Sequence, residues 1–288
     1  MTRTACLLVA MLALATVAVP AATAAAAADA TQPAKRVVSL NPSLTAMLLA
    51  LGAENVLVGV DTFSARQQPS LRDLPTVGGL YNSGLEAVVA LQPDLVVFVP
   101  SAEQRDFQRR LQEVGLAVLP CNPVRWDEVL ETIVQLGDRV GRSAEATKRV
   151  EEIRAARTDV ERATDASARP RTVLVLQRDP LYVVGRGSFI DEMLGAAGAE
   201  NLAAEFDSPY PRVGREWLLE AAPDVILDSS HQPEGDDPLA WWSQWPSLPA
   251  VRSGRVIPLP EGRITLPGPY LDLAVRDLAA ALRAPEAP

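Results

Sequence analysis

"LEAVVALQPDLVVF", residues 85–98, carries the pattern that decides the fold, and "REWLLEAAPDVILD", residues 215–228, repeats it. In each segment a Glu stands seven positions before the Pro of a Pro-Asp pair: Glu86 before Pro93, and Glu216 before Pro223. An apolar run then follows. The residues ahead of Pro-Asp have a helical pattern, and the apolar run is typical of a buried strand. We therefore expect the same helix–strand unit twice in this chain.

A second repeat supports this interpretation. "ALGAENVL" (50–57) and "AAGAENLA" (196–203) share Gly-Ala-Glu-Asn, and each follows a helical pattern that contains Met-Leu. The two repeats occur in the same order, but their separations differ: 41 residues from Gly52 to Pro93, and 25 from Gly198 to Pro223. We therefore expect two related lobes that have diverged in length.

Short apolar runs alternate with helical patterns over residues 35–140 and again over 169–285, which predicts two α/β lobes with parallel sheets. Residues 141–168 interrupt the alternation. They contain a long helical pattern whose apolar stripe is thin, consisting of Val150, Ile153 and Val160. A long helix that is polar over most of its surface typically bridges domains. We expect it to connect the two lobes.

The first 28 residues have the composition of a cleaved signal peptide. Arg3 precedes an apolar core, and a run of small residues follows. The core is short for a bilayer span, although a membrane anchor is the alternative. We expect an exported protein that is not membrane-embedded. Cleavage would leave Cys121 as the one cysteine, expected to be buried at a strand end. The net charge of −9 argues against a nucleic acid partner.

The chain lacks the usual residue sets of an enzyme. It has one histidine, His231, in a polar loop, and no glycine-rich phosphate loop follows an apolar strand. No cysteine pair suggests a metal site. We expect no enzyme activity, metal or cofactor, although catalysis by carboxylates alone stays open. Ligands of open α/β sheets bind at the carboxyl ends of the strands. Several aromatic residues fall in or next to such loops, which favours binding of a flat or large ligand.

Three segments carry a resemblance to a known family: "RVVSLNPSLTAMLLALGAENVLVGVDTF", "LPTVGGLYNSGLEAVVALQPDLVV" and "PYPRVGREWLLEAAPDVIL". They resemble the periplasmic substrate-binding proteins of ABC importers for vitamin B12, haem and siderophores, and fit the B12-binding branch best. The resemblance implies two Rossmann-like lobes joined by a single long helix, with the ligand between them. It also implies a monomer that binds a corrinoid without chemistry and delivers it to permease subunits in the membrane.

The resemblance assigns roles to individual residues. It implies ligand contacts at Phe63, Leu80, Tyr81, Tyr182, Tyr210 and Arg263. Glu86 and Glu216 fall on the positions that dock to arginines of the permease. Haem is an alternative ligand, with Tyr81 as the candidate iron ligand. A ferric siderophore is another, because several arginines stand in the loops: Arg66, Arg178, Arg186, Arg212 and Arg263.

Overall fold

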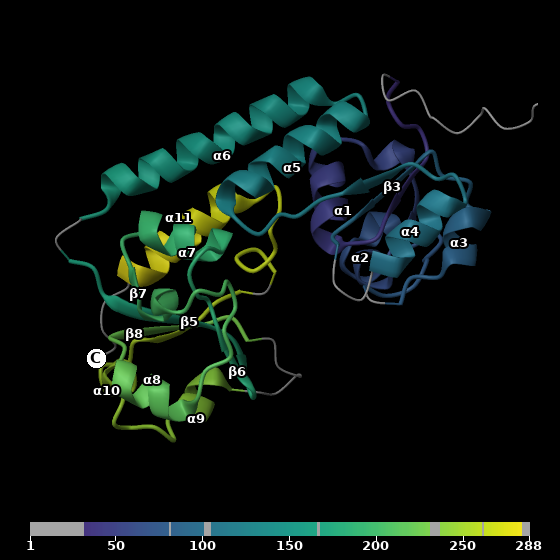
Figure 1. The fold of residues 1–288 in the computed structure, drawn as a ribbon. Coiled ribbons are helices and arrows are strands. Elements are labelled where there is room, and N and C mark those ends of the chain that lie inside the picture. Colours follow the sequence, from purple (N-terminus) through teal and green to yellow (C-terminus); the bar gives the residue numbers. More distant parts are fainter. Residues whose placement is uncertain are drawn as a thin grey trace, which may run out of the picture.

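A computed structural model of the chain describes residues 32–80, 82–100, 105–165, 168–230, 237–260 and 262–283. The expected signal peptide (1–28), Tyr81 and His231 lie outside the described residues. Figure 1 shows two α/β lobes side by side, with α5 and α6 running along one side of both.

The N-terminal lobe is built on a four-stranded parallel sheet in the order β2-β1-β3-β4. Its strands are β1 (Val37–Ser39), β2 (Leu57–Val60), β3 (Leu95–Phe98) and β4 (Val118–Pro120). Its helices are α1 (Pro42–Ala50), α2 (Thr62–Gln67), α3 (Leu85–Ala90), α4 (Arg105–Glu113) and α5 (Trp126–Arg139), with single 3-10 turns at Glu54–Val56 and Pro69–Leu71. Strands β1 and β3 are fully buried, as expected for a parallel sheet covered on both faces.

The C-terminal lobe contains a five-stranded sheet. Its strands are β5 (Arg171–Arg178), β6 (Leu181–Val183), β7 (Glu200–Asn201), β8 (Val225–Asp228) and β9 (Val256–Pro258). The helices are α7 (Phe189–Ala196), α8 (Arg215–Ala221), α9 (Pro238–Trp242), α10 (Pro249–Arg252) and α11 (Leu271–Arg283), with a 3-10 turn at Leu202–Glu205.

One strand departs from the expected parallel arrangement. Strand β6 pairs antiparallel with β5, whereas β7, β8 and β9 are parallel to their neighbours. Only Asp179 and Pro180 separate β5 from β6. A connection this short joins antiparallel strands, because a parallel pair needs a crossover of about a dozen residues.

Without β6, the two sheets have the same order. Strand β7 joins the edge of β5 opposite β8, because Thr172 pairs with Asn201 on one side and with Val225 on the other. The order β7-β5-β8-β9 therefore matches β2-β1-β3-β4. In both lobes a Met-Leu helix, α1 or α7, precedes the first strand of this order, and a Glu-headed helix, α3 or α8, precedes the third.

The repeated Pro-Asp pair forms the same corner in both lobes. Asp94 accepts hydrogen bonds from the backbone amides of Lys35 and Arg36, and Asp224 accepts one from the amide of Arg171. The Arg36 side chain donates to carbonyls at the end of α3, and the Arg171 side chain donates to a carbonyl at the end of α8. The Pro-Asp pair thus has a structural role, which leaves the glutamates available for function.

Helix α6 (Ser143–Ala163) lies between the two lobes in sequence and packs against both α5 and α11. Its buried side chains include the expected stripe and two alanines: Ala146, Val150, Ile153, Ala156 and Val160. All of these except Ala156 belong to one apolar core that contains residues of both lobes. The Arg149 guanidinium adds a hydrogen bond to the carbonyl of Pro269 (2.7 Å) and an ion pair with Asp272 of α11.

The lobes also contact each other directly beside α6. The Phe189 amide donates to the Val124 carbonyl (2.8 Å), and the Trp126 amide donates to Oε1 of Glu192 (3.2 Å). The Arg157 guanidinium lies 4.9 Å from the centroid of the Trp126 ring and 3.5 Å from Oε2 of Glu192. Cation–π and ionic contacts therefore connect α5, α6 and α7. A continuous core with these polar contacts favours small rather than large movements between the lobes.

Candidate functional site

Phe63 stands at the carboxyl end of β2 in an exposed position. The buried Asp61 caps α2, and its Oδ1 accepts hydrogen bonds from the amides of Phe63 (2.9 Å) and Ser64 (3.0 Å). These bonds fix the start of α2 and leave the Phe63 side chain 45% exposed. A large aromatic side chain held by its backbone at a strand end is suited to stack on a ligand.

Leu80 is half-buried on the loop that adjoins α2. The Thr62 amide donates to the Gly78 carbonyl (2.9 Å), and the Thr62 hydroxyl donates to the same atom (3.1 Å). Gly78 has a φ of 111°, which excludes other residue types in practice. The fold therefore brings Leu80 and Phe63, 17 residues apart in sequence, onto neighbouring segments of the N-terminal lobe.

Tyr182 and Tyr210 are brought together in the C-terminal lobe. Tyr182 lies in β6 and forms an isolated antiparallel bridge with Arg212. The amides of Val183 and Gly185 donate to the carbonyls of Pro211 (3.1 Å) and Pro209 (2.9 Å). The loop that carries Tyr210 thus runs along β6. Tyr182 is half-buried and Tyr210 is 38% exposed.

Desolvation of its hydroxyl raises the pKa of Tyr210 to about 12. Like any tyrosine, the side chain is a neutral phenol at neutral pH, and the shift keeps it neutral in alkaline solution as well. In this form it presents an apolar ring and a hydroxyl that can donate or accept a hydrogen bond.

The arginines considered as ligands for an anionic siderophore are partly occupied by carboxylates. Arg178 and Asp228 form an ion pair with Nε and Oδ2 2.8 Å apart, and their side chains are 1% and 0% exposed. Arg178 is therefore a structural residue rather than a free ligand for an anion. Arg263 is exposed, and its Nη1 lies 3.2 Å from Oδ2 of Asp277 in α11. The other three candidates, Arg66, Arg186 and Arg212, are exposed, so the siderophore alternative stays open.

A tryptophan cluster at α9 was not among the sequence predictions. The Trp242 indole donates to Oδ2 of Asp228 (2.5 Å), and the rings of Trp241 and Trp245 pack edge-on with centroids 4.4 Å apart. The Arg178 guanidinium lies 5.2 Å from the Trp241 ring centroid. Three tryptophans within "WWSQW" (241–245), in a chain with 5% aromatic residues, are the signal that points to this cluster.

Glu86 and Glu216 are exposed on α3 and α8, one in each lobe. Both stand in the first helical turn, after Gly84 and Gly214, which cap the helices without a side-chain hydrogen bond. Neither glutamate has an ion-pair partner within 4.0 Å among the described residues. A favourable interaction with the helix dipole, about 0.3–1 kcal/mol, leaves both carboxylates open to a partner.

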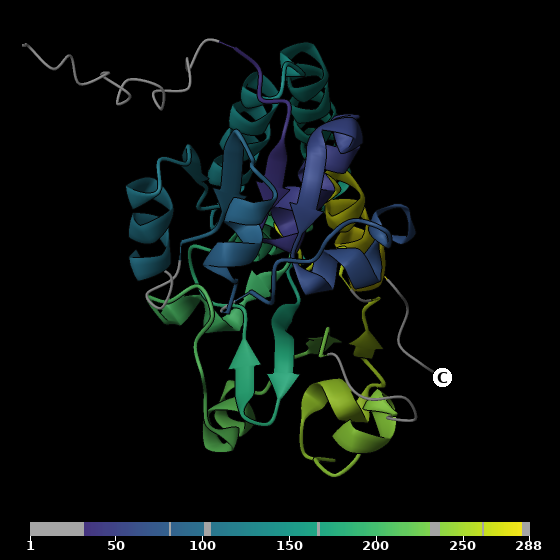
Figure 2. The ribbon, with the colours of Figure 1, turned by 90° about the vertical axis from the view of Figure 1, so that its right-hand side faces the viewer.

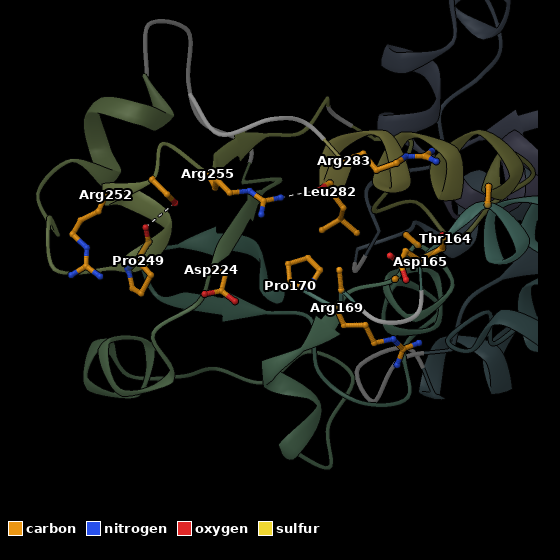
Figure 3. Close-up of a pocket in the computed structure, with 15 residues that line it drawn as sticks. Thr164, Asp165, Arg169, Pro170, Asp224, Pro249, Arg252, Arg255, Leu282 and Arg283 are labelled. Carbon is orange, nitrogen blue, oxygen red and sulfur yellow. Dashed lines mark hydrogen bonds between the residues drawn. The ribbon is translucent and has the colours of Figure 1, made fainter. Parts of the chain in front are cut away.

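A hollow of about 920 Å³ opens at the amino ends of the strands of the C-terminal sheet, opposite the ends that carry the predicted ligand contacts (Figure 3). Its lining includes Pro170, Asp224 and Arg255, which precede strands β5, β8 and β9. None of the residues predicted to bind ligand lines it, and its described lining contains no aromatic side chain. It is therefore separate from the candidate site at the carboxyl ends of the strands. Figure 2 shows the β5–β6 hairpin, whose turn lies at that carboxyl end.

Among the described residues, none of the helices combines the length and the apolar composition of a membrane-spanning segment. No group of three or more His, Cys, Asp or Glu residues there is arranged to hold a metal ion. Cys121 is buried, as expected, and burial raises the pKa of its thiol to about 12.

Two α/β lobes joined by the long helix α6 are the architecture of a two-lobed periplasmic binding protein. The chain belongs to the periplasmic binding protein family, whose model matches residues 37–262. This family consists of solute-binding proteins and not enzymes, and the chain is accordingly a binding protein.

The names of similar proteins give several ligands, among them vitamin B12, haem, iron and Fe3+-hydroxamate. The chain is 27% identical over 241 residues to a vitamin B12-binding protein of Vibrio parahaemolyticus, covering 83% of this chain and 86% of the relative. It is similar to a periplasmic haem-binding protein from Pseudomonas aeruginosa, with 28% identity, a TM-score of 0.72, and coverage of 88% and 95% of the two chains. The vitamin B12-binding protein BtuF of Vibrio cholerae shares the fold, with 24% identity, a TM-score of 0.73, and coverage of 87% and 97%.

Proposed function

We propose that this protein captures a corrinoid of the cobalamin type between its two lobes and delivers it to an ABC importer. In this proposal the first 28 residues are a signal peptide, and the mature protein works in the periplasm as a monomer. The observation that carries the ligand assignment is the similarity to a vitamin B12-binding protein over 83% of the chain. The aromatic residues at the carboxyl ends of the strands add support.

The ligand contacts that we propose come from both lobes. Phe63 and Leu80 would contact one side of the ligand, and Tyr182 and Tyr210 the other, with Tyr81 and Arg263 as further contacts. Rigid aromatic rings bury a large area at a small entropic cost, which suits a bulky and partly apolar macrocycle. Phe63 is held by the Asp61 cap, and Tyr210 by the pairing of its loop with β6.

Haem is the second candidate, and one observation favours it. The haem-binding protein from Pseudomonas aeruginosa is 28% identical to this chain, which is comparable with the similarity to the vitamin B12-binding relative. Haem and a corrinoid share a flat tetrapyrrole-like ring, so the same exposed aromatics would serve either. A haem ligand would also need an iron-coordinating side chain, for which Tyr81 is the candidate.

Absorbance titrations distinguish these ligands. The mature protein is titrated with cyanocobalamin, haemin and a ferric catecholate, and the absorbance spectrum of each compound is followed. We expect saturable binding of cyanocobalamin. Tight binding of haemin with a tyrosinate-to-iron band that Tyr81→Phe abolishes would instead assign haem. Absence of binding to all three compounds would refute the ligand proposal.

We further propose that Glu86 and Glu216 dock the protein to permease subunits. Opposite charges across an interface accelerate association and set the orientation of the partners. Because both side chains are exposed and unpaired among the described residues, the carboxylates are accessible. Glu86→Gln combined with Glu216→Gln should abolish stimulation of the importer's ATPase and leave ligand affinity unchanged. A fall in ligand affinity would instead place these residues at the ligand.

A further inference from the structure

Helices α3 and α8 each present an exposed apolar side chain beside the glutamate. In α3 the second residue is Glu86 and the fifth is Val89, which is 40% exposed. In α8 the second residue is Glu216 and the fifth is Leu219, which is 44% exposed. The fourth residue of each helix is buried in its own lobe. Residues three positions apart lie on one helix face, so each apolar side chain is next to its glutamate.

This arrangement occurs at equivalent places in the two lobes. Among the described residues eight large apolar side chains are exposed, and two of them occupy the fifth position of the two Glu-headed helices. The lobes otherwise differ in sequence between the repeated motifs. Val88 and Leu218 already anchor α3 and α8 in their lobes. The exposed Val89 and Leu219 are therefore not needed to pack these helices against the core. The repetition therefore points to a common external contact.

The surface is more extensive on the C-terminal lobe. Leu219 lines a small hollow together with Trp241 and Trp245, and the Arg215 guanidinium lies 5.8 Å from the Trp245 ring centroid. Both tryptophans are only partly buried. The apolar contact at this lobe thus continues from α8 onto α9. A partner that binds both lobes would meet two related but unequal surfaces, which is a means of fixing its orientation.

We infer that Val89 and Leu219 are contact residues for the same membrane partner that the two glutamates dock to; this inference rests on the proposed docking function. The partner must present, at two places, a basic side chain next to an apolar hollow. Charge complementarity supports this occupant, because each apolar side chain adjoins an exposed carboxylate on a chain of net charge −9. Burial of the apolar side chain excludes water from the adjacent ion pair and slows dissociation.

The test measures binding of the fluorescently labelled mature protein to spheroplasts of the source organism, which expose the outer surface of the cytoplasmic membrane. Three double variants are compared with wild type: Glu86→Gln with Glu216→Gln, Val89→Ser with Leu219→Ser, and the control Val114→Ser with Leu273→Ser. The control residues are also exposed, 50% and 38%, but lie outside α3 and α8. Circular dichroism verifies that each variant is folded.

The inference predicts that Val89→Ser with Leu219→Ser weakens binding roughly 10- to 30-fold, from the apolar area removed. The salt dependence of the remaining binding should match wild type, whereas the glutamine variant should lose it. The control should bind like wild type.

Wild-type affinity in the serine variant, with binding lost in the glutamine variant, would overturn the inference and leave glutamate docking intact. No binding by wild type, or full binding by the glutamine variant, would overturn the docking proposal itself. Self-association that Leu219→Ser abolishes would assign this surface to a dimer and also overturn the inference.

Discussion

Replacement of Asp228 by alanine should severely destabilise the C-terminal lobe. The carboxylate is completely buried and accepts four hydrogen bonds: from Nε of Arg178 (2.8 Å), from the indole of Trp242 (2.5 Å), and from the amide (2.9 Å) and hydroxyl (2.6 Å) of Ser230. Asp228→Ala therefore removes the carboxylate that pairs with Nε of the buried Arg178 guanidinium, and it leaves a buried indole N–H without this acceptor.

The magnitude follows from these contacts. Removal of one partner from a buried ion pair costs about 3–5 kcal/mol. An unsatisfied buried N–H adds about 1–3 kcal/mol. We expect a loss of at least about 4 kcal/mol, which is a large part of the roughly 5–15 kcal/mol that stabilises a typical domain.

Urea unfolding followed by far-ultraviolet circular dichroism measures this loss. The matched control is Arg178→Met combined with Asp228→Leu, which removes both charges and fills the space with apolar atoms. It should recover the stability lost with the unpaired charge, but it still lacks the hydrogen bonds that Trp242 and Ser230 donate to Asp228. The unsatisfied buried indole alone costs about 1–3 kcal/mol. A loss below about 1 kcal/mol in Asp228→Ala would refute the reasoning, because the ion pair would then be solvated.

Three further predictions concern the repeat, the thiol and the lobe contact. Gly52 and Gly198 both have positive φ, but a Cβ meets nothing within 4 Å at Gly52 and lies 2.2 Å from Cγ2 of Thr164 at Gly198. Gly52→Ala should cost about 1 kcal/mol and Gly198→Ala clearly more; equal losses of unfolding free energy would contradict this. Burial raises the pKa of the Cys121 thiol to about 12. The folded state therefore keeps a proton that the unfolded state loses above about pH 9, and the stability advantage over Cys121→Ala should shrink as pH rises past that point. A thiol reagent should accordingly react only after unfolding. Arg157→Ala removes the cation–π and ionic contacts between the lobes and should lower the unfolding free energy by about 1–2 kcal/mol; an unchanged value would show that these contacts are solvated.

The type and order of the helices and strands could be predicted, because each depends on the apolar pattern of its own segment. The alternation of apolar runs with helical segments gave the α/β lobes with parallel sheets, and the thin stripe of α6 gave a long helix between two packed bodies. The antiparallel β6 was missed. The apolar run "LYVVG" (181–185) contains strand β6, but its direction depends on the two-residue link at Asp179 and Pro180 rather than on the run itself.

The candidate site was only partly accessible from sequence. Phe63 and Tyr210 were assigned from the resemblance, and their exposure fits a contact surface. Arg178 was considered as a ligand for an anion because it follows a strand. Its partners Asp228 and Trp241 are 50 and 63 residues away in sequence. Such long-range pairing has no local signature, and the same holds for the packing of the Tyr210 loop on β6.

Calorimetric titration of the mature protein with cyanocobalamin tests the central claim most directly. The comparison uses wild type, Phe63→Ala with Tyr210→Ala, and the control Val114→Ala, which removes an exposed apolar side chain beyond α4. We predict one corrinoid per chain, with affinity reduced at least about tenfold in the double aromatic variant and unchanged in the control. Absence of cyanocobalamin binding by wild type, or equal affinity in all three proteins, would contradict the claim that aromatic residues of both lobes hold a corrinoid.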